Sequence, residues 1–305
     1  MARSIQDILR ISAKREDVVN STVTYIGYST TVATNTSDPV WQISRVTRQG
    51  TEYVTEYADD GNFTQVWDDR TSLFPIPALT NVYSVRFDGV DGNLDGGDIH
   101  NYDIANSFSV SMWVKPQNLS GTRILFSKAG SAPNVNGYML RHNVGGQIYI
   151  QLRSSSNRSH TFNSTLTSSV WQHLVFTYSG SSNISGAKLY LNDVIDTNLP
   201  GSGGLSGTWL EGQSFKLGSR GSSFYFSGNI DEVTVWDKEL TASEVSEIYN
   251  SGSPIDPTQH SASGSLASYY KMGDGDIYPT ISDNVGSDDL SMVGMVAGDI
   301  EEDVP

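Results

Sequence analysis

The feature that most constrains this chain is a long series of short segments in which apolar and polar residues alternate, with Gly, Asn and Asp in the turns between them. A period of two places every second side chain on one face, so these segments predict β-strands. Their number and spacing are typical of two facing antiparallel sheets. The predicted strands span residues 84–87, 108–114, 124–128, 138–142, 147–153, 171–178, 188–191, 215–218 and 230–236.

One helix is predicted after the last of these strands. Thr241-x-x-Glu244 forms a capping-box pattern, which marks the start of a helix. Val245, Ile248 and Tyr249 share one helical face, and Gly252 follows the end. We expect this helix to pack on the rim of the sandwich.

The first twenty residues carry a different pattern, with apolar residues spaced among charges and Ser4-x-x-Asp7 as a possible cap. This predicts a short helix, which is either a docking arm or an amphipathic helix lying on its own domain. The apolar positions are Ile5, Ile8, Leu9 and Val18.

Strand patterns return at residues 23–26, 41–46, 53–57 and 63–67 and predict a small antiparallel unit. A unit of this size buries little apolar surface, so we expect it to depend on a neighbour or on copies of itself. Pro75 and Pro77 then form a stiff, extended break. The predicted domains are a helical arm at 1–20, a small β domain at 21–78 and a β-sandwich at 79–305.

The charge balance argues against nucleic acid as a partner. The chain has 34 acidic and 19 basic residues, and its net charge of −15 would repel a phosphate backbone. Cysteine is absent, so stability must come from core burial, assembly or oxygen-ligated ions. No secretory signal pattern follows Met1 and no apolar run is long enough to span a bilayer, so we expect synthesis in a cytoplasm and no membrane insertion.

Several strand segments together resemble a known family. Val85-Arg-Phe-Asp-Gly-Val-Asp91 is similar to the opening strand of the laminin-G-like (concanavalin A-like) jelly rolls of bacterial and phage proteins. The resemblance continues in the same order through residues 108–115, 171–174, 188–192 and 228–244. It departs at the hairpin Asn192-Asp193, where many members have Asn-Gly, although both residues tolerate positive φ. The resemblance implies an all-β sandwich of the laminin-G-like type.

The ends of the chain resemble proteins of tailed phages. Residues 266–274, 281–283 and 294–296 are similar to a closing segment of phage laminin-G-like proteins, and residues 25–28, 41–45 and 66–70 to a small N-terminal virion module. This implies a virion structural protein, assembled in the host cytoplasm, that displays a lectin-like domain as a tail fibre or as capsid decoration. Other virion proteins, bound through the N-terminal region, and host-surface glycan are the implied partners, and we expect a homo-oligomer. The alternatives are a secreted or cell-surface bacterial adhesin and a polysaccharide-active enzyme.

The carboxylates do not form a recognisable catalytic pattern. A glucanase on this fold would resemble the family that carries the motif Glu-x-Asp-x-x-Glu on one strand, where alternate residues face the substrate cleft. That motif does not occur in this sequence. Asp231 and Glu232 are adjacent and should face opposite sides of a strand, while Glu244 and Glu247 lie on the predicted helix. The five histidines are scattered. We therefore expect no enzyme activity.

Calcium is the one cofactor that the sequence suggests, because hard cations prefer carboxylate and carbonyl oxygens. Asp88 and Asp91 lie in an Asp-rich loop, and Asp231 begins the last long strand. The family resemblance implies that the loop and Asp231 lie side by side as a structural calcium site. The alternative is that Asp88 and Asp231 accept backbone N–H bonds at strand ends.

Aromatic residues in predicted loops are candidates for stacking on sugar rings. These are Tyr102, Trp209 and Tyr225, whereas Trp113, Trp171 and Trp236 are expected in the core or on a sheet face.

Overall fold

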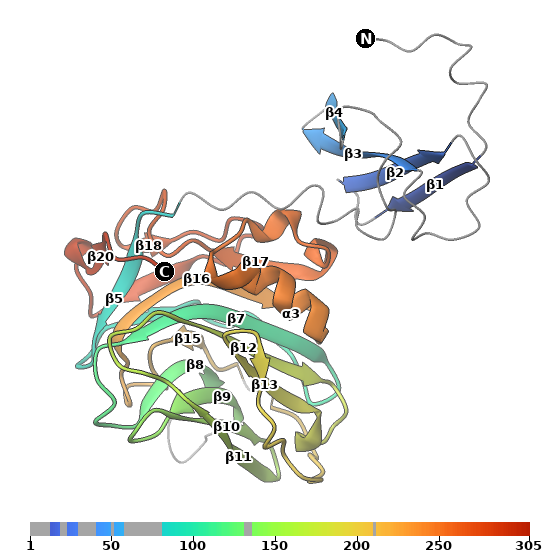
Figure 1. Cartoon of the computed structure of the whole chain (residues 1–305). Helices are drawn as coiled ribbons and strands as arrows, with labels where there is room; N and C mark the ends of the chain where they lie inside the picture. The colour runs from blue at the N-terminus through green and yellow to red at the C-terminus, as the bar shows by residue number, and fades with distance from the viewer. Residues whose placement is uncertain are drawn as a thin grey trace. The chain divides into compact units, whose positions relative to one another are not determined.

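The computed structural model describes residues 81–130, 136–209 and 212–305, together with four strands nearer the N-terminus. The chain divides into two compact units, residues 1–77 with 259–264 and residues 78–258 with 265–305. Figure 1 shows the elements of both units. No helix in the described residues is long and apolar enough to cross a membrane.

The first unit contains an antiparallel sheet in the order β1-β2-β3-β4. Its strands are β1 (Ala13–Val18), β2 (Val23–Ser29), β3 (Trp41–Gln49) and β4 (Glu52–Tyr57). The last three confirm predicted strands, and the strand predicted at 63–67 lies outside the described residues.

The prediction of a helical arm at 1–20 is wrong over Ala13–Val18. These residues pair along their whole length with β2, from Ala13 opposite Ser29 to Val18 opposite Thr24. Pairing with β2 supplies backbone hydrogen bonds that a local sequence pattern cannot predict. These bonds outweigh the helix propensity of the segment. The remainder of the predicted arm lies outside the described residues.

The second unit is a sandwich of two eight-stranded sheets, which confirms the predicted fold class. The first sheet has the order β11-β10-β9-β8-β15-β6-β19-β18. Its strands are β11 (Asn157–Thr165), β10 (Gln147–Arg153), β9 (Gly137–His142), β8 (Arg123–Ala129), β15 (Phe215–Leu217), β6 (Asn93–Asp95), β19 (Leu290–Val293) and β18 (Thr280–Ile281).

The second sheet has the order β14-β13-β12-β7-β16-β5-β20, and β17 pairs with β16 off this path. Its strands are β14 (Val194–Ile195), β13 (Ala187–Leu191), β12 (Gln172–Ser179), β7 (Ser107–Pro116), β16 (Ser227–Trp236), β5 (Ser84–Asp88), β20 (Ile300–Glu301) and β17 (Leu266–Tyr270). Strands from the far C-terminus therefore join both sheets, since β19 pairs with β6 and β20 with β5.

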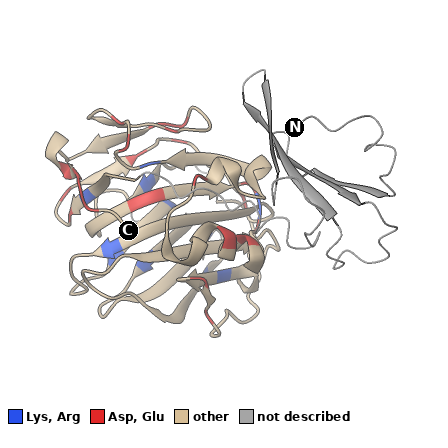
Figure 2. Cartoon of the chain, turned by 45° about the horizontal axis from the view of Figure 1, so that its top comes forward, with Lys and Arg blue, Asp and Glu red and all other residues tan. Residues whose placement is uncertain are grey.

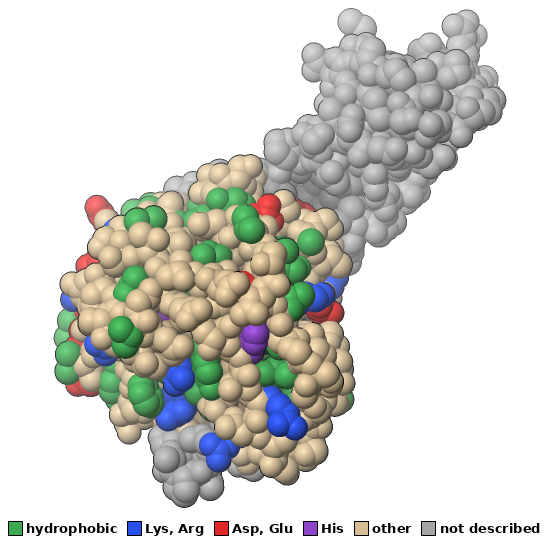
Figure 3. All heavy atoms as spheres, turned by 60° about the horizontal axis from the view of Figure 1, so that its bottom comes forward, with side chains coloured by type: hydrophobic (Ala, Val, Ile, Leu, Met, Phe, Trp, Pro, Cys, Tyr) green, Lys and Arg blue, Asp and Glu red, His purple; other side chains and the backbone are tan. Residues whose placement is uncertain are grey.

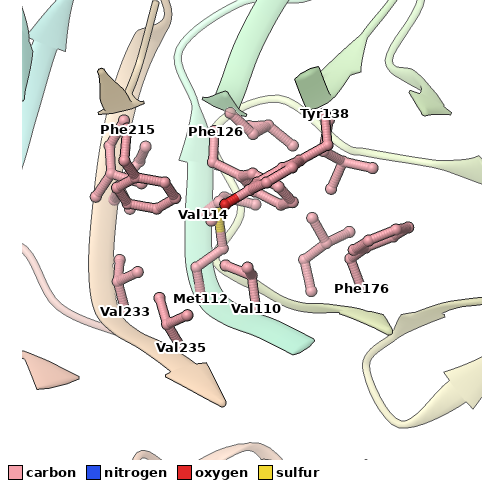
Figure 4. Packing of buried hydrophobic residues seen from close by; sticks show 14 of the residues in the cluster. Val110, Met112, Val114, Phe126, Tyr138, Phe176, Phe215, Val233 and Val235 are labelled. Atoms are coloured by element: carbon pink, nitrogen blue, oxygen red, sulfur yellow. The ribbon is translucent and has the colours of Figure 1, made fainter. Parts of the chain in front are cut away.

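The core lies between the two sheets and is built from the inward side chains of both (Figure 4). On β7, alternate residues Val110, Met112 and Val114 are buried in it, and Phe176 joins them from β12. Tyr138 and Phe126 enter from the first sheet, and the ring of Tyr138 lies 4.8 Å from that of Phe108. This interdigitation is the packing expected of two stacked sheets about 10 Å apart.

Every strand predicted in the sandwich is present, and most of the strands that were not predicted are shorter than five residues. In β11 only Phe162 of nine residues is buried, because this strand forms the edge of its sheet and exposes most of its side chains. The other unpredicted strands are β6, β14, β17, β18, β19 and β20.

The predicted helix is α3 (Ala242–Tyr249), and its capping box is formed by Thr241 and Glu244 as expected. The side chain of Tyr249 stacks on Trp113 and His173, with ring centroids 6.0 and 5.7 Å away. Both partners belong to the outward-facing positions of β7 and β12. The helix therefore covers part of the outer face of the second sheet, and the expectation that it packs on the rim is wrong.

Candidate ligand-binding face

The outer face of the first sheet carries polar and aromatic side chains at the positions that alternate with the core. Ile148, Ile150 and Leu152 of β10 are fully buried in the core, so Tyr149, Gln151 and Arg153 point to the opposite side. On β9 the same alternation turns Met139 and Arg141 outward. Register pairs Tyr149 with Arg141 and Gln151 with Met139, so these side chains form neighbouring rows.

A third arginine reaches this surface from the loop after β15. The loop is held down by a bond from Ser127 Oγ to the carbonyl of Ser219, 2.7 Å long. Arg220 and Ser223 exchange two backbone hydrogen bonds of 3.1 Å, which closes a tight turn. Arg220 Nη1 lies 3.7 Å from the sulfur of Met139. The turn thus fixes a guanidinium group over the sheet.

We call the surface formed by Arg141, Tyr149, Arg153 and Arg220 the arginine face, and Met139 lies buried beneath it. The guanidinium of Arg141 lies over the ring of Tyr149, 4.0 Å from its centroid, which is a cation–π contact. Figure 3 looks onto this side of the molecule, where basic side chains are distributed over the surface and acidic ones lie mainly towards its margins.

The arginines on this face have no acidic partner in the described part of the chain, where the ion pairs involve other basic residues. Burial lowers the pKa of Arg141, and burial together with the charges of Arg141 and Arg153 lowers the pKa of Arg220. The Nε–H groups of Arg141 and Arg220 are buried without a hydrogen-bond acceptor. Since nearly all buried donors in native proteins are paired, two such orphans on one surface need an explanation.

A second unusual group is a buried carboxylate pair in β16. Ile230, Val233 and Val235 all belong to the core, so the regular alternation is broken between them. Glu232 has a φ of 48° and the register against β7 shifts at this point, which identifies a β-bulge. Asp231 and Glu232 therefore lie on the same side, and the expectation that they face opposite sides is wrong. Figure 2 shows acidic residues within a central strand as well as in loops.

Both carboxyls of this pair are almost completely buried. Asn81 Nδ2 donates to Asp231 over 2.5 Å, and the Tyr269 hydroxyl donates to Glu232 over 2.6 Å. Burial raises the pKa of each group well above its usual range, and the charge of Asp231 raises the pKa of Glu232 further. Both carboxyl groups are therefore enclosed by protein.

The structure does not bring the predicted calcium ligands together. Asp88 pairs with Ser227 across the sheet, whereas Asp231 lies four residues further along β16, a distance of about 13 Å at 3.3 Å per residue. Within residues 81–130, 136–209 and 212–305, no group of three or more histidine or acidic side chains is arranged to hold a metal ion. Asp88, Asp91 and Asp231 therefore do not fit one shared site.

Asp88 instead organises the loop that follows it. Its Oδ1 accepts hydrogen bonds from the backbone N–H groups of Val90, Asp91 and Gly92 at 2.8, 3.3 and 3.2 Å. Burial acts to raise the pKa of Asp88, but these three bonds outweigh it and the pKa is lowered. Asp231 likewise accepts the N–H of Glu232. Asp88 and Asp231 thus accept backbone N–H bonds, as the alternative to a calcium site predicts. Calcium binding itself stays a prediction.

Two of the three aromatic residues proposed for sugar stacking lie in the core. Trp209 is 1% exposed and donates its Nε1–H to the carbonyl of Tyr102, while the Tyr102 hydroxyl donates to Asp237. The third, Tyr225, is half-buried. The burial of Trp113 and Trp236 is as expected. Sequence reasoning missed Tyr149, although its alternation with Ile148 and Ile150 indicates an outward position.

The match to known families agrees with this architecture. A family model described as the concanavalin A-like lectin/glucanases superfamily, of the laminin-G type, matches residues 88–246. The chain belongs to this superfamily. No curated protein matches the sequence. In this concanavalin A-like domain the arginine face is contributed by β9, β10 and the loop after β15, all within the matched residues.

Solved structures that are similar to this chain are distant in sequence. A putative carbohydrate-binding protein from Bacteroides ovatus is 14% identical, with a TM-score of 0.51 over 90% of this chain and 67% of that chain. A heptameric SAP-like pentraxin from Limulus polyphemus is 18% identical, with a TM-score of 0.42 over 56% and 83%. The CBM40 module of a Ruminococcus gnavus sialidase is 13% identical, with a TM-score of 0.40 over 53% and 95%. At 14% identity the likeness to the Bacteroides ovatus protein concerns the fold alone.

Proposed function

We propose that this chain is a structural protein of a tailed-phage virion, whose concanavalin A-like domain binds host-surface glycan without catalysis. The observation that carries the binding role is the arginine face, where polar and aromatic side chains are held in place on strands and two buried donors lack acceptors. Rigid strands position such groups with little loss of entropy on binding. The virion role is supported by the resemblance of the first and last segments to tailed-phage proteins.

A non-catalytic role is supported by the position of the acids. Glycoside hydrolysis requires two carboxyls about 5–10 Å apart that flank an accessible bond. The adjacent pair Asp231 and Glu232 is enclosed, with Glu232 only 6% exposed and bonded to Tyr269. The arginine face itself contains no carboxyl group among its four residues.

Multiple copies would compensate for weak binding at each site. A sheet face buries less of a sugar than a deep pocket does, so the affinity of one domain should be low. Display of many domains on one particle raises the effective concentration and hence the avidity. In this proposal the N-terminal region attaches the protein to other virion proteins and brings copies of the chain together.

A glycan array tests the proposal. The full chain is applied once as the purified protein and once on virions, and the retained signal is compared for each glycan. We expect weak signals for the free chain and much stronger signals for the same glycans with virions. Failure of both forms to bind any glycan would contradict the binding role, and release of reducing sugar by the purified chain would contradict the absence of catalysis.

Absence of the protein from purified virions would contradict the structural role. Mass spectrometry of gradient-purified particles measures this directly. Detection of the chain on the surface of the bacterium that encodes it would instead favour the alternative of a cell-surface adhesin.

A further inference from the structure

We propose that the glycan recognised by the arginine face is acidic, with a carboxylate or sulfate group placed between Arg141 and Arg220 and a sugar ring beside Tyr149. This inference rests on the proposed glycan-binding function and adds the chemical class of the ligand. It would also assign to Arg153 a supporting electrostatic role at the margin of the site.

The first argument is the charge distribution. The chain has a net charge of −15, so a random surface should contain acidic residues near each basic one. The charges that lower the pKa of Arg220 are nevertheless those of Arg141 and Arg153, and none of the three arginines forms an ion pair in the described part of the chain. The charges of Arg141 and Arg153 therefore repel the guanidinium of Arg220, and an anion bound beside Arg220 would relieve that repulsion.

The second argument is the hydrogen-bond inventory of the guanidinium groups. Arg141 has no hydrogen-bond acceptor and Arg220 has only the weak sulfur acceptor of Met139 within the described residues. Each Nε–H is already out of contact with water, so part of the desolvation cost has been met before a ligand arrives. A carboxylate or sulfate is the acceptor that matches a guanidinium best, because two oxygens can take two parallel N–H bonds.

The third argument is that these side chains are fixed in position. Arg141 is held by the ring of Tyr149, and Arg220 lies 5.0 Å from the ring centroid of Phe224 in addition to its contact with Met139. Aromatic and sulfur contacts orient a guanidinium group without using its hydrogen-bond donors. The face is therefore organised for an anion that the described protein itself does not supply.

The test compares glycans that differ only in one acidic group. The full chain is immobilised at high density, and its binding to lactose, 3′-sialyllactose and 3′-sulfolactose is measured by surface plasmon resonance at low and high salt. We expect both acidic glycans to bind at least about tenfold more tightly than lactose, as a charge-assisted bond would give. The preference should weaken at high salt because screening reduces exposed electrostatic interactions. The two acidic arms distinguish a carboxylate from a sulfate as the preferred group.

Variants locate the site. Arg141→Gln and Arg220→Gln should each reduce the affinity for the acidic glycan about tenfold or more, and Arg141→Lys should restore only part of it because lysine lacks the planar fork. Arg158→Gln is the matched control. Arg158 lies on the neighbouring strand β11 opposite Leu152, which faces the core, so Arg158 is not part of the arginine face. Its side chain donates to the carbonyl of Gly204. A thermal melt of each variant verifies that it is folded.

The outcomes separate the two proposals. Equal binding of lactose and its acidic derivatives would overturn the present inference and leave the glycan-binding function in place. If Arg141→Gln and Arg220→Gln bind the acidic glycan with the same affinity as the wild type, the assigned site is wrong. Binding of no glycan, neutral or acidic, by the chain or by virions would overturn the proposed function and this inference with it.

Discussion

Replacement of Trp209 by alanine distinguishes a core residue from a sugar platform. The indole is 1% exposed, lies 6.0 Å from the ring of Tyr138 and 5.8 Å from that of Tyr178, and donates to the carbonyl of Tyr102. Burying up to about 250 Å² of tryptophan at about 25 cal/mol per Å² gives an upper bound of about 6 kcal/mol. Measured tryptophan and phenylalanine truncations in cores cost about 3–5 kcal/mol, and we expect a value in this range.

Urea denaturation of the full chain, followed by far-ultraviolet circular dichroism, measures this cost. The midpoint of the sandwich transition should fall while its slope stays the same, because the surface exposed on unfolding hardly changes. Trp171→Ala is the matched control, since Trp171 is only partly buried and bonds Asp303 at 3.1 Å, and we expect it to cost less than about 1 kcal/mol. A loss below about 1 kcal/mol for Trp209→Ala, combined with loss of glycan binding by the folded variant, would refute the placement of Trp209 in the core.

Two further predictions concern the acids. Burial raises the pKa of Asp231 and Glu232 in the folded state. Above about pH 4 the folded chain therefore binds more protons than the unfolded chain. The free energy of unfolding consequently falls as the pH rises towards the folded-state pKa. Glu232→Gln removes one of these titrations, so the melting temperature of the variant relative to the wild type should increase between pH 5 and pH 8; a relative decrease would contradict the assignment. Asp88→Ala leaves three backbone N–H groups without their acceptor and should cost about 1–3 kcal/mol in thermal or urea unfolding. The loss should be equal with EDTA and with calcium, and a loss seen only with calcium would support Asp88 as a metal ligand.

The alternation of apolar and polar residues is sufficient to predict the sandwich, because burial between two sheets imposes a period of two on long strands wherever no bulge interrupts them. β10 illustrates this, since its predicted and observed ends coincide at Gln147 and Arg153. The same reasoning fails at edges. β11 exposes most of its residues and β1 depends on pairing with β2, so neither leaves a strong local pattern.

The binding face could be predicted only in part. The alternation within β10 places Tyr149 and Arg153 outward, but the meeting of these residues with Arg220 depends on a loop about seventy residues later in the chain. The carboxylate pair was misplaced for a related reason. Residues other than glycine seldom adopt a left-handed backbone conformation, so the sequence around Glu232 does not predict the bulge. That bulge turns the side chain of Glu232 to the same side as that of Asp231.

The pairing of β19 with β6 and of β20 with β5 determines where the domain can be truncated. The family match ends at residue 246, before β17, β18, β19 and β20 begin. A fragment trimmed to that boundary would leave β5 and β6 with rows of unpaired backbone N–H and C=O groups, which are templates for pairing with other chains. Such a fragment should aggregate edge to edge, because residues 266–305 supply the short strands that pair with β5 and β6 in the whole domain.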